Sequence, residues 1–302
     1  MDAFLVIAIV IGVGAVVGRA GLLGDNARTV LNRMTFHIGV PALLILNLSQ
    51  AKFDDIFSAP LLTSATAALS TFVLCFGIFA VLRRRSRGDS TVASWTASYV
   101  NAGNFGIPLS AYLFGDTTAI AAILLFQAAV MAPLGFAILN SATHPPASPW
   151  RQVVALARNP VLAASVVGLV LASTGIGLPE VLSRPVELLA DLAIPTALLA
   201  FGLSLSARSV HTPYNRGDLL IAVASKTILM PAVAYVVGRW AVHIGSDQLL
   251  LVTILAALPS AQNINTYAAV FQRNESLAGH ATLASTVVSA PIITAIVVIA
   301  GA

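Results

Sequence analysis

The sequence predicts an all-α integral membrane protein whose ten transmembrane helices form two inverted repeats of five helices each. Three observations predict this fold: an apolar composition, an alternation of basic loops, and a repeated order of motifs. Of the 302 residues, 58% are hydrophobic and only 9% are charged, whereas soluble domains carry about 25% charged residues. The mean hydropathy is +0.90. We therefore expect the lipid bilayer to surround most of the chain.

Ten apolar stretches of about 20 residues, the length that spans a bilayer, follow one another along the chain. Between the fifth and the sixth lies a proline-containing stretch, 142–152, which we interpret as a cytoplasmic linker. It separates a first five-helix repeat, 1–141, from a second repeat, 153–302. The ten stretches are 3–20, 28–49, 59–82, 91–114, 118–140, 153–174, 182–205, 217–240, 247–271 and 277–300.

The basic residues test this count, because cytoplasmic loops carry an excess of lysine and arginine. When the loops are numbered from an external N-terminus, the odd loops hold twelve Lys and Arg residues and the even loops three. A missed helix would mix the two groups. We therefore expect a multi-pass protein of the cell (inner) membrane with both termini outside. The arginine run at 83–87 then marks a membrane surface, and no nucleic-acid partner is expected.

Short motifs recur in the same order in the two halves, 154 to 158 residues apart. Each match alone is weak, but three matches at a nearly constant offset indicate an internal repeat. Because five is an odd number of crossings, the second repeat enters the membrane from the opposite side, which is typical of many secondary transporters. The matching positions are Pro41 and Pro195, Phe114 and Phe271, and Pro133 and Pro291.

Two polar interruptions lie at matching places, one in the fourth helix and one in the ninth. Asparagine needs polar partners in hydrocarbon, and proline removes a backbone donor and clashes with the preceding turn. Such segments are tolerated only where they are buried in protein or line a water-filled cavity. Paired broken helices indicate a transporter's binding site. We expect the two segments to cross and to bind substrate through Asn101, Gly103, Asn104, Gly106, Pro108, Pro259, Ser260, Gln262, Asn263 and Asn265.

Half-helix ends at such a crossing could bind ions of either sign. The N-terminal ends present unpaired N–H groups and a partial positive charge, which suit a carboxylate. Neutral side-chain and backbone oxygens could instead hold a cation, for example sodium near Asn104 and Gln262. In the alternative interpretation, the polar side chains only cap the broken helices.

The segment Asn101-Ala102-Gly103-Asn104-Phe105-Gly106-Ile107-Pro108 resembles the helix-4 motif of the auxin efflux carrier family, the bacterial relatives of plant PIN proteins. The resemblance covers the whole chain, with a short central loop as in bacterial members. It implies a fold related to bile-acid/sodium symporters, in which helices 4 and 9 cross. It further implies that helices 1, 2, 6 and 7 form a scaffold and that helices 3–5 and 8–10 form a moving (elevator) transport unit. The substrates that the resemblance implies are organic anions such as auxin or malonate.

Lys226 is a charged residue close to the predicted middle of the membrane. It lies ten residues after Arg216, or about 15 Å into the bilayer at about 1.5 Å per residue. A charge there costs about 2.5–3.5 kcal/mol on insertion scales, so Lys226 should face a partner or a cavity. It could attract an anionic substrate, fill a site where a symporter holds sodium, or release its proton and so couple transport to protons. It could also be a structural lysine bonded to the freed carbonyls of a broken helix.

Asp191 and His37 hold equivalent positions in the two repeats, each four residues before a proline. Asp191 could pair with Lys226 or carry a proton, and histidine titrates in the physiological range. Both residues lie on helices that the resemblance assigns to the scaffold, so packing or a homodimer contact through these helices is an equal alternative. For the polar residues of the fifth and tenth helices, helix–helix hydrogen bonding is the default interpretation: Gln127, Ser285 and Thr286.

The function that these patterns favour is secondary transport of a small organic anion by alternating access at the helix 4/9 crossover. The alternative is a sodium/proton-type exchanger or a sodium-coupled symporter on the same fold, although neither interruption contains a carboxylate. An enzyme is disfavoured, because no nucleophile motif or clustered zinc ligands occur. With one cysteine, Cys75, no disulfide and no cysteine-based metal site is expected, and no cofactor apart from a possible coupling to sodium or protons. Gly12 and Gly14 are expected to be close-packing positions, because no strand precedes them as in a nucleotide loop.

Overall fold

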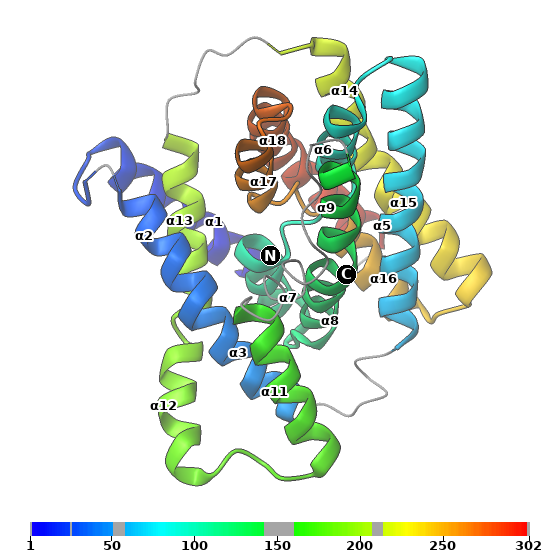
Figure 1. Ribbon diagram of the computed structural model, residues 1–302. Coiled ribbons are helices and arrows are strands. Elements are labelled where there is room, and N and C mark those ends of the chain that lie inside the picture. The colour runs from blue at the N-terminus through cyan, green and yellow to red at the C-terminus, as the bar shows by residue number, and fades with distance from the viewer. Residues whose placement is uncertain (1, 25, 51–57, 142–159, 207–213, 301–302) are drawn as a thin grey trace. The chain divides into compact units, whose positions relative to one another are not determined.

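The computed structural model describes residues 2–24, 26–50, 58–141, 160–206 and 214–300 (Figure 1). These residues are mostly helical, and among them the extended backbone pairs only once, in an isolated antiparallel bridge between Val100 and Ser260. The predicted linker 142–152 lies outside the described residues. The all-α prediction is therefore confirmed for the part of the chain that the structure describes.

Within the described ranges, six helical segments are long and apolar enough to cross a membrane. Shorter apolar helices cover Ile9–Arg19, Ala163–Thr174 and Ser246–Ala256. This confirms a membrane protein with several spans, whereas the count of ten stays a prediction. The six long segments are Ala27–Ser49, Ala59–Leu82, Thr118–Leu139, Val181–Leu203, Arg216–Val242 and Glu275–Ala300.

The chain divides into two compact units, and unit 1 comprises Met1–Ser58, Ala102–Ala128 and Trp150–Arg208. Within it α1 lies along α13, and α11 lies along α3 (Figure 1). Its helices, with π-helical turns written η, are α1 (Asp2–Arg19), α2 (Ala27–Met34), η1 (Thr35–Gly39), α3 (Val40–Gln50), η3 (Ala102–Gly106), α7 (Ile107–Phe114), α8 (Thr118–Phe126), α11 (Pro160–Thr174), α12 (Glu180–Ala190) and α13 (Ala193–Ser206).

Two glycines allow α1 and α13 to approach closely. A Cβ at Gly14 would lie 2.6 Å from the Leu199 carbonyl oxygen, and a Cβ at Gly202 would lie 2.8 Å from the Ala15 nitrogen. Such distances are too short for a carbon, so only glycine fits at both positions. The prediction for Gly14 is therefore confirmed. The prediction for Gly12 is wrong, because nothing lies within 4 Å of a Cβ built there.

Unit 2 comprises Ala59–Asn101, Ala129–Pro149 and Ser209–Ala302. The π-helical turn η4 (Gln127–Met131) joins α8 of unit 1 to α9 of unit 2. The helices of unit 2 are α5 (Ala59–Gly77), η2 (Ile78–Leu82), α6 (Arg87–Ser98), α9 (Ala132–Ser141), α14 (Arg216–Ala224), η5 (Ser225–Leu229), α15 (Met230–Val236), η6 (Val237–Val242), α16 (Ser246–Ala256), α17 (Asn263–Phe271) and α18 (Glu275–Ala300).

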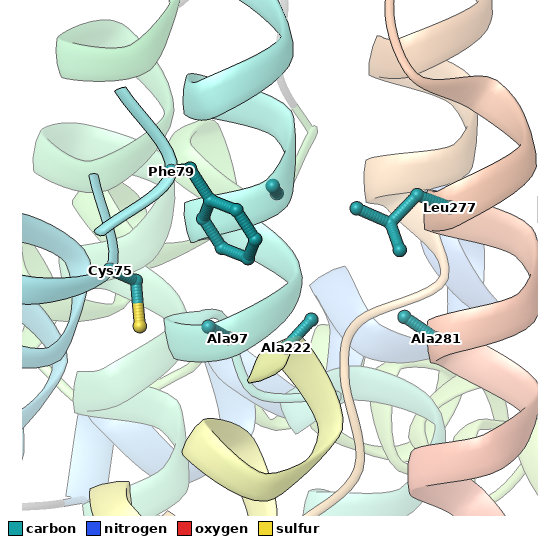
Figure 2. Packing of buried hydrophobic residues seen from close by; sticks show 7 residues of the cluster. Cys75, Phe79, Ala97, Ala222, Leu277 and Ala281 are labelled. Carbon is teal, nitrogen blue, oxygen red and sulfur yellow. The ribbon is translucent and has the colours of Figure 1, made fainter. Parts of the chain in front are cut away.

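A cluster of buried hydrophobic side chains joins α5, η2, α6, α14 and α18 in unit 2 (Figure 2). Most of its members are small, so the helices pack closely around the Phe79 ring and the Leu277 side chain. Small residues at helix contacts are typical of membrane proteins, where packing replaces the hydrophobic driving force. The buried members are Cys75, Phe79, Ala93, Ala97, Ala222, Leu277 and Ala281.

α6 and α14 begin with the same kind of cap. The Ser86 side chain accepts a hydrogen bond from the Asp89 N–H, and the Asn215 side chain accepts one from the Asp218 N–H, each at 3.1 Å. These bonds satisfy N–H groups that have no intrahelical partner. Asp218 is buried and also accepts hydrogen bonds of 2.7 Å from two arginines of the α5–α6 connection, Arg83 and Arg85.

Four π-helical turns each end two residues before a proline. Proline has no N–H, and its ring clashes with the carbonyl one turn back, so the preceding turn widens. The prolines are Pro41 after η1, Pro108 after η3, Pro133 after η4 and Pro231 after η5. Each widened turn holds one polar residue that the sequence analysis singled out: His37, Asn104, Gln127 and Lys226, respectively.

Candidate functional site at the paired helix interruptions

The interruptions after α6 and after α16 pair with each other inside unit 2. α6 ends at Ser98, and Tyr99 takes an extended conformation. The Asn101 N–H donates to the Pro259 carbonyl at 2.8 Å, and the Ala261 N–H donates to the Tyr99 carbonyl at 3.0 Å. Backbone groups freed by one broken helix are therefore satisfied by the other, as a buried or membrane environment requires.

Ser260 connects this pairing by hydrogen bonds to α6 and to α18. Its hydroxyl donates to the Thr96 carbonyl of α6 at 2.5 Å, and its N–H donates to the Ser285 hydroxyl of α18 at 3.0 Å. The Ser285 hydroxyl in turn donates to the Thr282 carbonyl at 3.1 Å. Ser260 and Ser285 are fully buried. The predicted helix–helix hydrogen bond of Ser285 is present, and it lies at the interruption itself.

Lys226 contacts the end of the helix that precedes the second interruption. Its Nζ donates to the carbonyl oxygen of Ala256, the last residue of α16, at 2.5 Å. The side chain is 0% exposed. Among the described residues the ion pairs are those of Arg83 and Arg85 with Asp218, so Lys226 has no carboxylate partner there. This geometry agrees with the hypothesis that the lysine bonds to a freed carbonyl of a broken helix.

A cluster of aromatic and amide groups lies beside the pairing. The Asn263 amide donates to the Tyr267 hydroxyl at 3.2 Å, and the buried Tyr99 side chain hydrogen-bonds with both residues. The Tyr267 ring packs on Phe136, with ring centroids 4.9 Å apart, and on Trp95, at 5.4 Å. The sequence analysis missed these aromatic residues, although Tyr99 directly precedes the first interruption.

α17 begins at Asn263, immediately after the second interruption. The Asn265 N–H donates to the Gln262 carbonyl at 3.1 Å. The Asn265 side-chain oxygen is buried and has no hydrogen-bond donor among the described residues. A buried acceptor without a donor is costly, so it is a candidate ligand atom. Gln262 and Asn263 are half-buried, while Pro259 and Ser260 are buried.

The remaining residues of the first interruption lie in unit 1. Asn104 lies in η3, and its amide donates to the Asn32 side-chain oxygen at 3.3 Å. Gly103 has nothing within 4 Å of a built Cβ. Gly106 and Pro108 are buried at the start of α7. The sequence analysis did not single out Asn32, which lies one turn before η1 on α2.

His37 and Asp191 are both exposed in unit 1. The His37 Nδ1 lies 3.1 Å from the Arg33 carbonyl oxygen, and Asp191 lies in the short turn between α12 and α13. The two equivalent segments pack closely, because a Cβ at Gly39 would lie 2.8 Å from Ala193 Cα. Their roles as proton carriers stay predictions.

The other polar positions are built into helix packing. Gln127 is buried in η4, and the Thr286 hydroxyl donates to the Thr282 carbonyl at 2.8 Å. The described residues contain no group of three or more His, Cys, Asp or Glu side chains that could hold a metal ion. The side chains described at the pairing carry hydroxyl and amide groups, together with the amine of Lys226.

Comparison with known proteins identifies the class. Residues 1–297 match the family described as "Membrane transport protein". The chain is 24% identical to the "Uncharacterized transporter YfdV" of Escherichia coli (strain K12), over 85% of this chain and 83% of that protein. It is 29% identical to the "Putative malonate transporter" of Rhizobium meliloti (strain 1021), over 78% of this chain and 75% of that protein.

The apolar helices and this whole-length match define the chain as a membrane transporter. It belongs to the membrane transport protein family, the auxin efflux carrier family that its fourth-helix motif resembles. The relatives carry the names of transporters and not of enzymes.

Proposed function

We propose that this chain is a secondary carrier that moves a small organic anion across the cytoplasmic membrane by alternating access at a crossover of its fourth and ninth helices. The observation that carries the proposal is the backbone pairing between Tyr99–Asn101 and Pro259–Ala261. It brings together two interruptions that lie at matching positions of the sequence repeat. The name of the rhizobial relative supports a dicarboxylate of malonate size as the first substrate to test.

The second interruption has features that suit a carboxylate. The N-terminal turn of α17 directs a partial positive charge toward the interruption. Asn263 and Asn265 stand in this turn, and neutral amides can donate to a carboxylate without a fixed countercharge. We propose that these residues, together with the interruption-lining residues predicted from the sequence, bind the anion.

The proposed topology has ten spans in a 5+5 inverted repeat with both termini outside. The proposed scaffold helices 1, 2, 6 and 7 fall in unit 1, and helices 3, 8, 9 and 10 of the proposed transport unit fall in unit 2. This grouping supports the proposed division for eight helices. The segment Ala102–Ala128, which holds parts of helices 4 and 5, groups with unit 1 instead.

Uptake into proteoliposomes tests the proposal. We expect saturable uptake of radiolabelled malonate or another small carboxylate from a panel, and we expect Asn263→Ala to raise KM or abolish uptake. Thr294→Ala is the matched control, because Thr294 is exposed on α18 and its hydroxyl donates to the Ala290 carbonyl of its own helix. Absence of saturable flux for every carboxylate, or equal loss in both variants, would contradict the proposal. Sodium or proton flux without organic substrate would favour the exchanger.

A further inference from the structure

Three segments of unit 2 that lie far apart in the sequence meet at the beginning of α14. Arg83 and Arg85, in the connection from α5 to α6, each donate to the buried Asp218 carboxylate of α14 at 2.7 Å. Figure 1 shows this connection beside the beginning of α14. The turn before α18 joins them, because the Asn274 amide donates to the Asp89 carbonyl of α6 at 3.4 Å.

Glycine at the second residue of α6 and of α14 lets an arginine from another segment lie against each helix. A Cβ at Gly88 would lie 3.2 Å from side-chain atoms of Arg273. A Cβ at Gly217 would lie 2.9 Å from the Nη2 atom of Arg83. These contacts bring arginines of all three segments to the same end of unit 2.

Positive charge exceeds negative charge where these segments meet. Their six arginines form what we call the arginine surface: Arg83, Arg84, Arg85, Arg87, Arg216 and Arg273. The same segments hold three carboxylates, and one of them, Asp218, is already paired with two of the arginines. Among the described residues these two are the ion pairs. Arg84, Arg87 and Arg216 are exposed, so a partner outside the chain can reach their charges.

The arginine surface lies where candidate membrane spans begin and end. The span Ala59–Leu82 ends directly before Arg83, and the span Arg216–Val242 begins with an arginine. The span Glu275–Ala300 begins two residues after Arg273. In a bilayer, the lipid headgroups lie at this level, immediately beyond the apolar core. The guanidinium group binds phosphate through paired N–H donors, so the position and the chemistry point to the same partner.

We propose that the arginine surface binds the headgroups of anionic phospholipids. Basic residues next to a membrane span attract negatively charged lipids, and the attraction grows with each added Lys or Arg. Three separate segments contribute to this surface, so a bound headgroup would connect the beginnings of α6 and α14 with the turn before α18. The inference goes beyond the proposed function, because lipid binding at this surface involves neither helix interruption.

Titration of the purified full-length protein with tail-labelled fluorescent lipids, in a neutral detergent, provides the test. We expect wild type to bind phosphatidylglycerol more tightly than phosphatidylcholine, and we expect salt to weaken this preference. The double variant Arg87→Gln/Arg216→Gln should lose about fivefold in affinity for phosphatidylglycerol per arginine at low salt. Arg239→Gln is the matched control and should bind as wild type does, because Arg239 is exposed near the opposite end of the segment Arg216–Val242.

Three outcomes would overturn the proposal. One is equal affinity of wild type for the two lipids, and another is an equal loss in Arg239→Gln and in the double variant. The third is full displacement of phosphatidylglycerol by an equal concentration of inorganic phosphate, which would assign the surface to a soluble anion. If the double variant does not fold, the lipid preference and the salt series of wild type still decide. The measurement needs no transport, so a failure of carboxylate uptake does not affect it.

Discussion

Ser260 joins the two interruptions at the level of single atoms. Its hydroxyl donates a hydrogen bond to the Thr96 carbonyl, and its N–H donates one to the Ser285 hydroxyl. We predict that Ser260→Ala lowers the free energy of unfolding by about 1–3 kcal/mol, because a buried carbonyl loses its donor. Thermal unfolding checks this, with Thr294→Ala as the control. Equal stability of the two variants would show that the Thr96 carbonyl finds another donor.

Gly135 illustrates a residue whose identity depends on a distant neighbour. A Cβ at Gly135 would overlap the Trp95 ring, which donates from its Nε1 to the Met131 carbonyl at 3.3 Å. We predict that Gly135→Ala destabilises the protein by about 1–3 kcal/mol through overpacking. Gly279→Ala is the matched control, because Gly279 is also helical and nothing lies within 4 Å of its built Cβ. If Gly279→Ala lowers the Tm as much as Gly135→Ala does, the contact of position 135 with the Trp95 ring does not explain the loss.

At the scale of helices, the close contact of α1 with α13 rests on two glycines. We predict that Gly14→Ala or Gly202→Ala separates the helices and lowers the apparent Tm. Gly12→Ala should not lower it, because a Cβ there meets nothing within 4 Å. Alanine also favours a helix over glycine by about 0.8–1.0 kcal/mol, so Gly12→Ala can even stabilise. A larger loss for Gly12→Ala than for Gly14→Ala would refute this packing.

The widened turn η5 holds Lys226, and Pro231 follows this turn by two residues. Pro231→Ala restores the missing N–H, so we expect the turn to tighten into regular α-helix and to rotate Lys226 away from the Ala256 carbonyl. The carrier should then lose uptake, although its helix propensity rises. Pro291→Ala is the matched control, because Pro291 lies inside α18 without a π-helical turn. Unchanged uptake in Pro231→Ala would show that transport does not depend on the widened turn.

Particular residues show what the sequence could predict at this scale. The apolar runs and their polar interruptions predicted helices that break near Ser98 and near Ala256, since hydrophobicity and proline act locally. The partners of Ser260, Asn104 and Tyr99 could not be predicted, because they depend on residues 25 to 168 positions away. The π-helical turns were also missed, although a proline two residues beyond the turn marks four of them: η1, η3, η4 and η5.

At the scale of the whole molecule, the proposed orientation can be measured directly. Cys75 is the sole cysteine and is buried, so a Cys75→Ala background allows single cysteines to be placed in loops. We predict that a membrane-impermeant maleimide labels Asp116→Cys in intact cells, and labels Arg84→Cys only after permeabilisation, because the proposed topology places the fourth loop outside and the third in the cytoplasm. Labelling of Arg84→Cys in intact cells would contradict the proposed orientation.

The bridge between Val100 and Ser260 is built from main-chain atoms: the donors are the N–H groups of Asn101 and Ala261, and the acceptors are the carbonyls of Pro259 and Tyr99. Main-chain hydrogen bonds are available to nearly any amino acid. Side chains around the interruption, apart from Ser260, can therefore change during evolution without breaking these main-chain hydrogen bonds. A transporter built in this way can change its substrate by single substitutions while it keeps the same fold.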